Sequence, residues 1–219
     1  MTANHHPSEA WLMDYALGNV PEAFETILMA HVGSCDVCRA NVEAAEQFGG
    51  EVVAATRAVS DAVSIPLPEI DSAANSAPVM YEPISLAVDA GTNGGFDFFV
   101  RTYLNCSSES LRWRRLGSGL AICRLREEDN VKMWLLKARP GTVLPQHTHQ
   151  GSELTLVLKG AYFCGEALFK AGDIEDADEA TRHQPMVTGS EDCICLAVTE
   201  GSLQFKSPIA KLAQKFVGI

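Results

Sequence analysis

The sequence lacks a long apolar run. No stretch of about 18 apolar residues, the length that spans a bilayer, occurs among the 219 residues. The opening residues, Met1 to His6, contain no basic region followed by an apolar one, which is the pattern of a secretory signal. We therefore expect a folded, cytoplasmic protein without a membrane partner. Its hydrophobic content of 47% is enough to fill the core of one large domain or of two ordinary ones.

The sequence also lacks the even set of cysteines that a disulfide framework needs. Seven cysteines are present, and two of them, Cys35 and Cys38, form a Cys-x-x-Cys pair. In a reducing compartment such a pair is more typical of metal binding or redox chemistry than of a structural bridge. We therefore expect free or metal-bound thiols.

Basic residues are scarce in the first part of the chain. Residues 1–85 contain twelve Asp or Glu and only two Arg, a net charge of −10, whereas residues 86–219 carry a net charge of −1. This asymmetry opposes direct binding to nucleic acid or to an anionic membrane, because phosphates would be repelled. It favours a basic partner surface, such as that of a DNA-binding protein. A solvated acidic face that only maintains solubility is the alternative, and the charge alone does not decide between them.

Helical periodicity organises the first part. Three helices are predicted, over about residues 8–18, 21–33 and 34–62. The second helix carries an apolar stripe that ends in an inward-facing histidine: Phe24, Ile27, Leu28 and His31.

A change of composition separates two predicted domains. The Pro-, Ser- and Ala-rich stretch at 65–78 predicts a break in the helical structure, and one more short helix is expected near 75–85. A Gly-rich segment follows, so we predict a helical domain at 1–85, a linker at 86–100 and a second domain at 101–219.

The second domain is rich in short β-branched and apolar runs separated by turn residues. They predict an antiparallel sandwich or barrel, followed by an amphipathic tail helix at 209–216. The predicted fold class is therefore multidomain, a small α domain followed by an all-β domain. The predicted strands lie at 120–125, 131–136, 154–158, 161–164, 193–198 and 203–205.

A histidine and two cysteines meet at a predicted helix junction. His31 ends the second helix, and Cys35 and Cys38 begin the third. A helix N-terminus favours thiolate over thiol, and the Cys-x-x-Cys spacing lets two sulfurs reach one ion. A fourth ligand from His5 or His6 would complete a closed tetrahedral zinc site, and we favour His6 because it is nearer the entry to the first helix. A redox dithiol is the alternative for the cysteine pair taken alone.

This pattern resembles the zinc anti-sigma family over about residues 1–85. A histidine, about 25 further residues and then His-x-x-x-Cys-x-x-Cys occur in an acidic helical domain. The resemblance implies a zinc ion held by His6, His31, Cys35 and Cys38. It also implies a domain that wraps an alternative sigma factor and blocks its contact with core RNA polymerase.

The second domain contains the first cupin motif with every spacing kept. Positions 147, 149 and 153 differ by even numbers, so on extended backbone their side chains would share one face. In a barrel this face can point to the interior. The match implies a cupin barrel, also called a double-stranded β-helix. The motif reads Gly141-x5-His147-x-His149-x3-Glu153-x6-Gly160.

The remaining histidine, His183, follows Gly172 by eleven residues, as the second cupin motif requires. With His147, His149 and Glu153 it forms a set that suits Zn, Mn, Fe or Ni and leaves one position open. The alternatives are a cupin that has lost its metal and a polar cluster on a surface strand. Asp178, Ala180 and Val187 replace a usual proline, glycine and asparagine, which puts the local turn and any bound substrate in doubt more than the ligand His183.

Cys193 and Cys195 lie two apart on a predicted strand and therefore share a face. Such cysteines are most often small core residues. The functional alternative places them near the metal, where they would take part in sensing oxidation.

The two modules together resemble the ChrR-type anti-sigma factors over nearly the full length. The resemblance implies repression of an ECF (group IV) sigma factor, with release under singlet oxygen or related stress. In this hypothesis residues 1–85 hold the sigma factor, and the cupin metal centre converts the signal into release. We expect no enzyme, and two alternatives remain. One is a cupin metalloenzyme, such as a dioxygenase or hydrolase, and the other is a redox switch in which Cys35 and Cys38 form a disulfide and release zinc.

Overall fold

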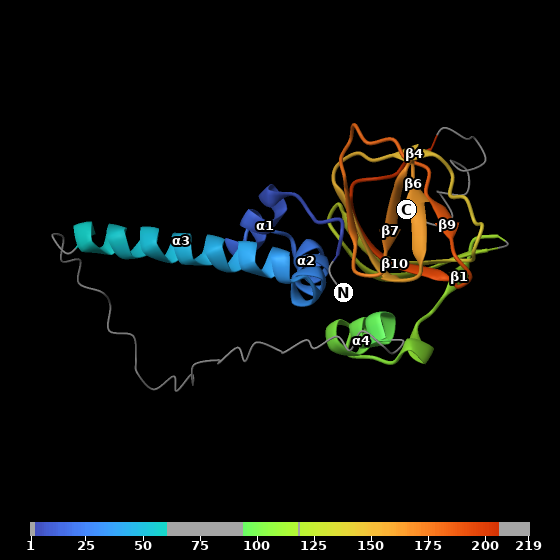
Figure 1. Cartoon of the computed structure of the whole chain (residues 1–219), viewed down its shortest axis with the longest axis horizontal. Helices are drawn as coiled ribbons and strands as arrows, with labels where there is room; N and C mark the ends of the chain where they lie inside the picture. Colours follow the sequence, from blue (N-terminus) through green and yellow to red (C-terminus); the bar gives the residue numbers. More distant parts are fainter. Residues whose placement is uncertain (1–2, 61–93, 118, 206–219) are drawn as a thin grey trace.

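The computed structural model describes residues 3–60, 94–117 and 119–205 (Figure 1). Within these ranges a layer of helices packs against an antiparallel β-barrel. The break predicted at 65–78, the short helix expected at 75–85 and the tail helix expected at 209–216 lie outside the described residues.

The three helices predicted in the first part are present. They are α1 (Glu9–Ala16), α2 (Glu22–Ser34) and α3 (Asp36–Ser60). The helix α1 ends just before Gly18, whose φ of +68° is a conformation that glycine adopts without strain. The stripe of α2 is buried as predicted, His31 included. Across the described ranges no helix is long and apolar enough to cross a membrane.

A fourth helix, α4 (Gly94–Tyr103), occupies residues 94–100 of the expected linker at 86–100, whose residues 86–93 lie outside the described ranges. Phe96, Phe99, Val100 and Tyr103 recur at helical spacing, and Phe99 and Val100 are completely or almost completely buried. Gly95, one of the glycines that suggested a linker, has a packing role, because a Cβ there would come within 2.5 Å of the Leu158 carbonyl oxygen.

All six predicted strand runs contain strands. Five further strands were not predicted, because segments of two to four residues are too short to show a period of two. One sheet has the order β1-β2-β3-β10-β5-β8, a second has the order β7-β6-β9, β11 pairs with β4, and all pairs are antiparallel. The strands are β1 (Arg114–Arg115), β2 (Leu120–Glu128), β3 (Val131–Ala138), β4 (His147–Thr148), β5 (Glu153–Lys159), β6 (Ala161–Cys164), β7 (Ala167–Lys170), β8 (Ile174–Ala177), β9 (Met186–Thr188), β10 (Cys193–Glu200) and β11 (Gln204–Phe205), with a 3-10 turn at Ser108–Ser110.

The central strands of the large sheet are buried on both faces. On β10, Cys195 and Ala197 face the interior of the barrel, whereas Leu196 and Val198 face outward into the helical layer. A strand covered on both sides reads as a continuous apolar run rather than an alternating one, which is the pattern seen here.

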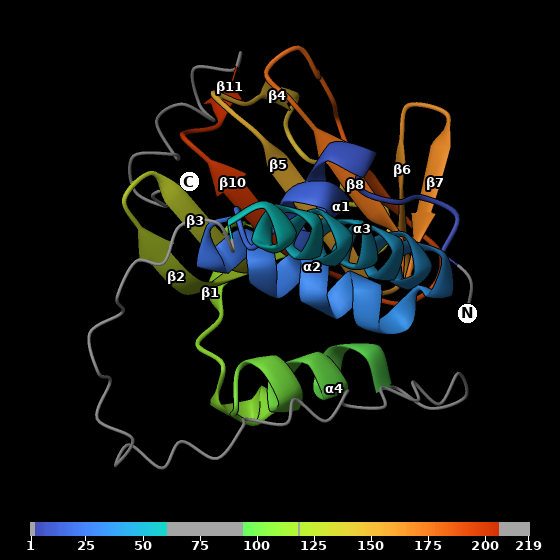
Figure 2. The ribbon, with the colours of Figure 1, turned by 90° about the vertical axis from the view of Figure 1, so that its left-hand side faces the viewer.

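The outward face of this sheet is covered by α2 and α4 (Figure 2). Phe24, Ile27 and Leu28 of α2 are at most 1% exposed and belong to the same hydrophobic cluster as Phe99 and the outward-facing side chains of β5 and β10. Burial of each such side chain stabilises the fold by about 1.5–3 kcal/mol. The helical layer and the barrel therefore share one core.

Candidate metal centres

The first centre forms where the N-terminal segment, α2 and α3 meet. His31 lies in the last turn of α2, Cys35 follows it, Cys38 is in the first turn of α3, and His6 approaches from the segment before α1. The Nδ1 atom of His6 lies 3.4 Å from Cys35 Sγ and 3.3 Å from Cys38 Sγ, and His31 Nε2 lies 3.3 Å from Cys38 Sγ. All four donor atoms lie within 4.8 Å of one another.

These distances fit a tetrahedral zinc ion. Zn–N and Zn–S bonds of normal length at a tetrahedral angle separate nitrogen from sulfur by about 3.5 Å. The Nδ1 atom of His31 donates a hydrogen bond of 3.0 Å to the Gly172 carbonyl, so its Nε2 presents a lone pair to the site. Burial lowers the pKa of His31 to about 4, which keeps the imidazole neutral as a ligand must be.

Cys38 would need a cation beside it to act as a thiolate ligand. Burial, together with the neighbouring Cys35, raises the pKa of Cys38 to about 12, so without a cation its thiol stays protonated at neutral pH. A zinc ion would supply the positive charge that makes the thiolate stable in this buried position.

His6, rather than His5, faces the cysteines. The ring of His5 instead packs on Phe169, with ring centroids 4.3 Å apart, and its carbonyl accepts a hydrogen bond from the Ile174 amide. The structure thus brings together the four residues predicted for this centre and gives His5 a docking contact with the barrel.

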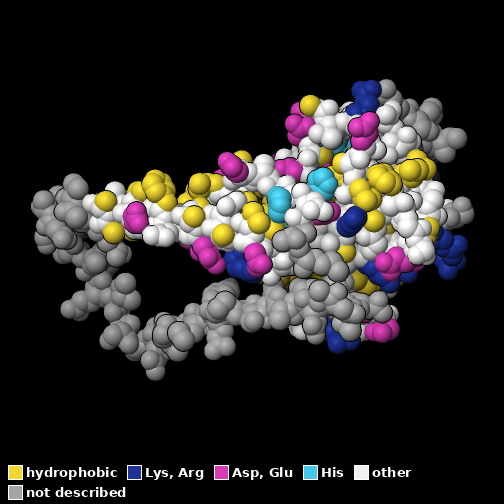
Figure 3. All heavy atoms as spheres, in the orientation of Figure 1, with side chains coloured by type: hydrophobic (Ala, Val, Ile, Leu, Met, Phe, Trp, Pro, Cys, Tyr) yellow, Lys and Arg dark blue, Asp and Glu magenta, His cyan; other side chains and the backbone are white. Residues whose placement is uncertain are grey.

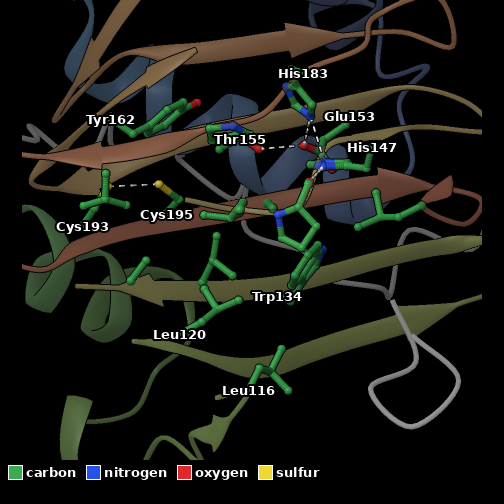
Figure 4. Close-up of a pocket in the computed structure, with 18 of the residues that line it drawn as sticks. Leu116, Leu120, Trp134, His147, Glu153, Thr155, Tyr162, His183, Cys193 and Cys195 are labelled. Atoms are coloured by element: carbon green, nitrogen blue, oxygen red, sulfur yellow. Dashed lines mark hydrogen bonds and ion pairs between the residues drawn. The ribbon is translucent and has the colours of Figure 1, made fainter. Parts of the chain in front are cut away.

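The second centre lies inside the barrel (Figure 4). His147 comes from β4, His149 directly follows that strand, Glu153 begins β5, and His183 lies between β8 and β9. All four side chains are buried. His183 Nε2 is 2.9 Å from His147 Nε2 and 4.0 Å from a Glu153 carboxylate oxygen, and His149 Nε2 is 3.4 Å from the other oxygen.

The orientation of the imidazoles fits a bound cation. His147 donates from Nδ1 to the Pro145 carbonyl at 2.9 Å, and His183 donates from Nδ1 to Glu175 at 2.8 Å. Their two Nε2 lone pairs therefore face each other, which is unfavourable unless a cation lies between them. The ring of His149 is buried, and its Nε2 lies 3.4 Å from a Glu153 carboxylate oxygen. A divalent ion at this point would take one nitrogen from each of the three rings and an oxygen of Glu153.

The route by which these side chains converge differs from the sequence argument. A single extended backbone was expected to place positions 147, 149 and 153 on one face. The chain instead bends at residues 150–151, and Glu153 enters from a separate strand. The bend is tight, since a Cβ on Gly151 would lie 3.1 Å from Glu200.

Glu175 supports the second centre and was missed by the sequence analysis. Burial opposes its ionisation, but the hydrogen bonds from His183 and Tyr162 hold its pKa below the ordinary value. It therefore stays a carboxylate and fixes the tautomer of His183. It lies on β8, a four-residue strand that the sequence pattern did not reveal, so only its position eight residues before His183 could have drawn attention to it.

The departures from the second cupin motif have local explanations. The side chain of Asp178 accepts hydrogen bonds from the amides of Ala180 and Thr181, so it closes the turn without proline or glycine. Val187 is buried on β9 and lines an interior cavity, where the usual asparagine would place a polar group.

This cavity, of about 390 Å³, adjoins the second centre (Figure 4). Cys193 and Cys195 lie in its wall, with their sulfurs 3.6 Å apart. The hydrogen bond between them and their burial raise the pKa of Cys195 well above its ordinary value, so this thiol is protonated and a poor nucleophile.

The strand β8 and the turn before it touch both centres. Gly172 accepts the hydrogen bond of His31, and Asp173 Oδ1 accepts from the amides of Asn4 at 2.6 Å and His5 at 3.2 Å. Two residues later, Glu175 holds His183. One short segment thus positions ligands of the helical centre on one side and of the barrel centre on the other.

Comparison with known proteins identifies the family. The chain is 36% identical over all 219 residues to the anti-sigma-E factor ChrR of Cereibacter sphaeroides, with both chains covered completely. The chain belongs to the ChrR family of anti-sigma factors. Residues 102–204 of this ChrR-family chain match the model of the ChrR cupin-like domain. Its structure resembles the crystal structure of Rhodobacter sphaeroides SigE in complex with the anti-sigma ChrR, with a TM-score of 0.68, 32% identity and coverage of 91% of this chain and 100% of that one.

Proposed function

We propose that the chain binds and inhibits an ECF (group IV) sigma factor through its helical layer and releases it when the cupin centre receives a signal. The observation that carries the proposal is the match over 91% of the chain to a ChrR chain solved in complex with SigE. We propose zinc for the helical centre, and zinc or another divalent metal for the cupin centre.

The proposed sigma-binding surface is the outer side of α1 and α3 (Figure 3). It exposes large apolar side chains on an otherwise acidic layer, a combination that suits a partner with apolar contacts framed by basic residues. Hydrophobic atoms follow α3 along the part that projects from the body of the molecule. The exposed side chains are Met13, Leu17, Val37, Phe48, Val52 and Val53.

The segment 172–176 provides a route from signal to release. A change in the coordination of His183 would reach Glu175 through their hydrogen bond. It would then reach Asp173, two residues earlier, whose carboxylate holds the amides of the chain just before His6. The proposal needs only that residues 172–176 take two conformations, with and without the signal, that differ in how well Asp173 holds the N-terminal segment.

Co-purification tests the repressor function. The full chain, co-expressed with ECF sigma factors of its host, should retain one of them and block its transcription in vitro. Cys38→Ser should abolish this binding and lower the zinc content by one equivalent. Recovery of no sigma factor with the zinc-loaded wild-type chain would overturn the proposal.

Variants of the second centre test the division of labour. His147→Ala and Glu153→Gln should bind the sigma factor as the wild type does, but fail to release it when singlet oxygen is generated. Asp173→Asn should weaken release while leaving the cupin metal bound. Loss of all sigma binding in the cupin-ligand variants would show that the barrel holds the partner directly.

Release through the first centre is the redox alternative. It predicts a Cys35–Cys38 disulfide and loss of one zinc ion during release, whereas release through the cupin predicts that this zinc remains bound. The cupin metalloenzyme is the second alternative. A hydrolase would use a free acid or base beside the metal, but among the described residues of the cavity wall Glu153 faces the histidines and Glu175 is bound by His183 and Tyr162. The match to an anti-sigma factor over the full chain favours the regulator over any enzyme.

A further inference from the structure

The interior cavity has one polar end and an apolar body (Figure 4). His147, Glu153 and His183 form the polar end. We propose that this cavity binds an aliphatic carboxylic acid, with the carboxylate on the cupin metal and the chain along the apolar wall. The proposal rests on the divalent ion assigned above to this centre, but it does not depend on sigma-factor inhibition. The apolar wall includes Leu120, Trp134, Leu136, Ala197, Leu203 and Phe205.

The open position of the centre selects the head group. Three imidazoles and Glu153 leave one position open on a divalent ion, and a carboxylate oxygen is an ordinary ligand for such a position. The carboxylates of Glu153 and Glu175 together already balance the charge of a divalent ion, so a head group of low negative charge is favoured. No Lys or Arg occurs among the described residues that line the cavity. A dianion such as phosphate would therefore bring a buried charge without a partner, which is costly.

The wall selects an apolar chain over a hydroxyl-rich one. The polar side chains Thr155 and Tyr162 already donate their hydroxyl groups to Glu153 and Glu175. A sugar placed here would lose its hydrogen bonds to water and gain few in return, whereas a hydrocarbon chain loses none.

The volume sets the length of the chain. At roughly 30 Å³ for each non-hydrogen atom, close to the share of one water molecule, a cavity of about 390 Å³ holds about thirteen atoms. Decanoate, with its ten carbons and two oxygens, fits this volume.

Trp134 is a built-in reporter of the cavity. Its side chain lines the cavity, so a ligand that fills this space changes the surroundings of its ring.

Titration of the full chain with fatty acids tests the proposal. Zinc-loaded protein would be titrated with hexanoate, octanoate, decanoate and hexadecanoate, followed by calorimetry and by tryptophan fluorescence. The affinity should rise about fourfold for each added methylene up to decanoate and then level off. Decanol should bind more weakly than decanoate, and metal-free protein should bind decanoate at least tenfold more weakly.

Filling the cavity provides the matched variants. Ala197→Leu, and Leu120→Trp as a second variant, should weaken decanoate binding at least tenfold while two zinc ions remain bound. Ala121→Leu, a comparable enlargement on the opposite face of β2, should leave the affinity unchanged. Acetate binding as tightly as decanoate, or no saturable binding of decanoate with the zinc content intact, would overturn the proposed ligand but not the proposed metal. Absence of zinc from the second centre would overturn both proposals.

Discussion

At the scale of single residues, the hydrogen bonds of three imidazoles suit the two candidate metal centres. His31, His147 and His183 each donate from Nδ1 to a carbonyl or carboxylate, and this leaves the lone pair of Nε2 available to an ion. Such outer partners fix the ring and raise its basicity, so their loss costs metal affinity even though they never touch the ion.

Glu175→Gln should therefore weaken metal binding at the second centre about 10- to 100-fold. The amide has nearly the same shape but loses the negative charge that stabilises the His183 tautomer. Competition with a chelator of known affinity would measure the change, and the first centre should keep its zinc. Glu179→Gln, an exposed change a few residues further along, is the control and should have no effect.

The burial of His31 predicts a loss of stability in acid. Its pKa is lowered to about 4, so between pH 6.5 and 4 the unfolded chain binds a proton that the folded chain does not. The stabilisation is complete above pH 6.5, and about 2 kcal/mol of it should be lost at pH 5. Urea unfolding of the metal-free chain at pH 7.5 and pH 5 would measure this loss, because no zinc then competes with protons for His31. The His31→Asn variant should show a smaller difference, and equal dependence in both chains would contradict the assignment.

At the scale of elements, periodicity predicted the helices and the longer strands but not the short ones. The buried face of α2 could be predicted because three apolar residues and His31 recur at helical spacing on one side of the helix. The strand β8 could not, because its four residues combine one buried acid and one exposed acid with two apolar side chains. The candidate site followed the same division: spacing and position in the sequence indicated the eight residues that the structure brings into two clusters, whereas Asp173 and Glu175 act through contacts that only the folded chain creates.

The exposed apolar side of α3 makes a prediction of its own. Phe48→Asp and Val52→Asp should weaken sigma-factor binding at least tenfold, because they place charge on side chains proposed for the contact. They should not lower the thermal stability of the free chain, since both residues are about half exposed or more. Val143→Asp, an equally exposed apolar position on the barrel, is the control. Unchanged sigma binding in the α3 variants would exclude this face.

At the scale of the whole molecule, one hydrophobic cluster joins the helical layer to the barrel. Phe24, Ile27 and Leu28 of α2 lie in the same cluster as the outward-facing side chains of β5 and β10. Composition does not show which outer faces meet, so this shared core could not be predicted from the sequence.

Unfolding should therefore be a single cooperative transition. Far-ultraviolet circular dichroism, which is dominated by the helices, and the fluorescence of Trp134 should change at the same temperature in a chain whose Trp11 and Trp113 are replaced by Phe. Leu28→Ala should lower both midpoints together and cost about 2–5 kcal/mol, because it opens a cavity between layer and barrel. Two separate transitions would show that the layer and the barrel unfold independently.

The helix α3 has a further consequence for experiments. Its 25 residues span about 37 Å, and much of the helix projects from the body of the molecule (Figure 1). Between Glu43 and Thr56 almost every side chain is exposed. A helical stretch without tertiary contacts is marginally stable in water, so its amide protons should exchange with deuterium quickly in the free chain. A bound protein along this stretch would slow that exchange, which gives a label-free reading of occupancy at each backbone position.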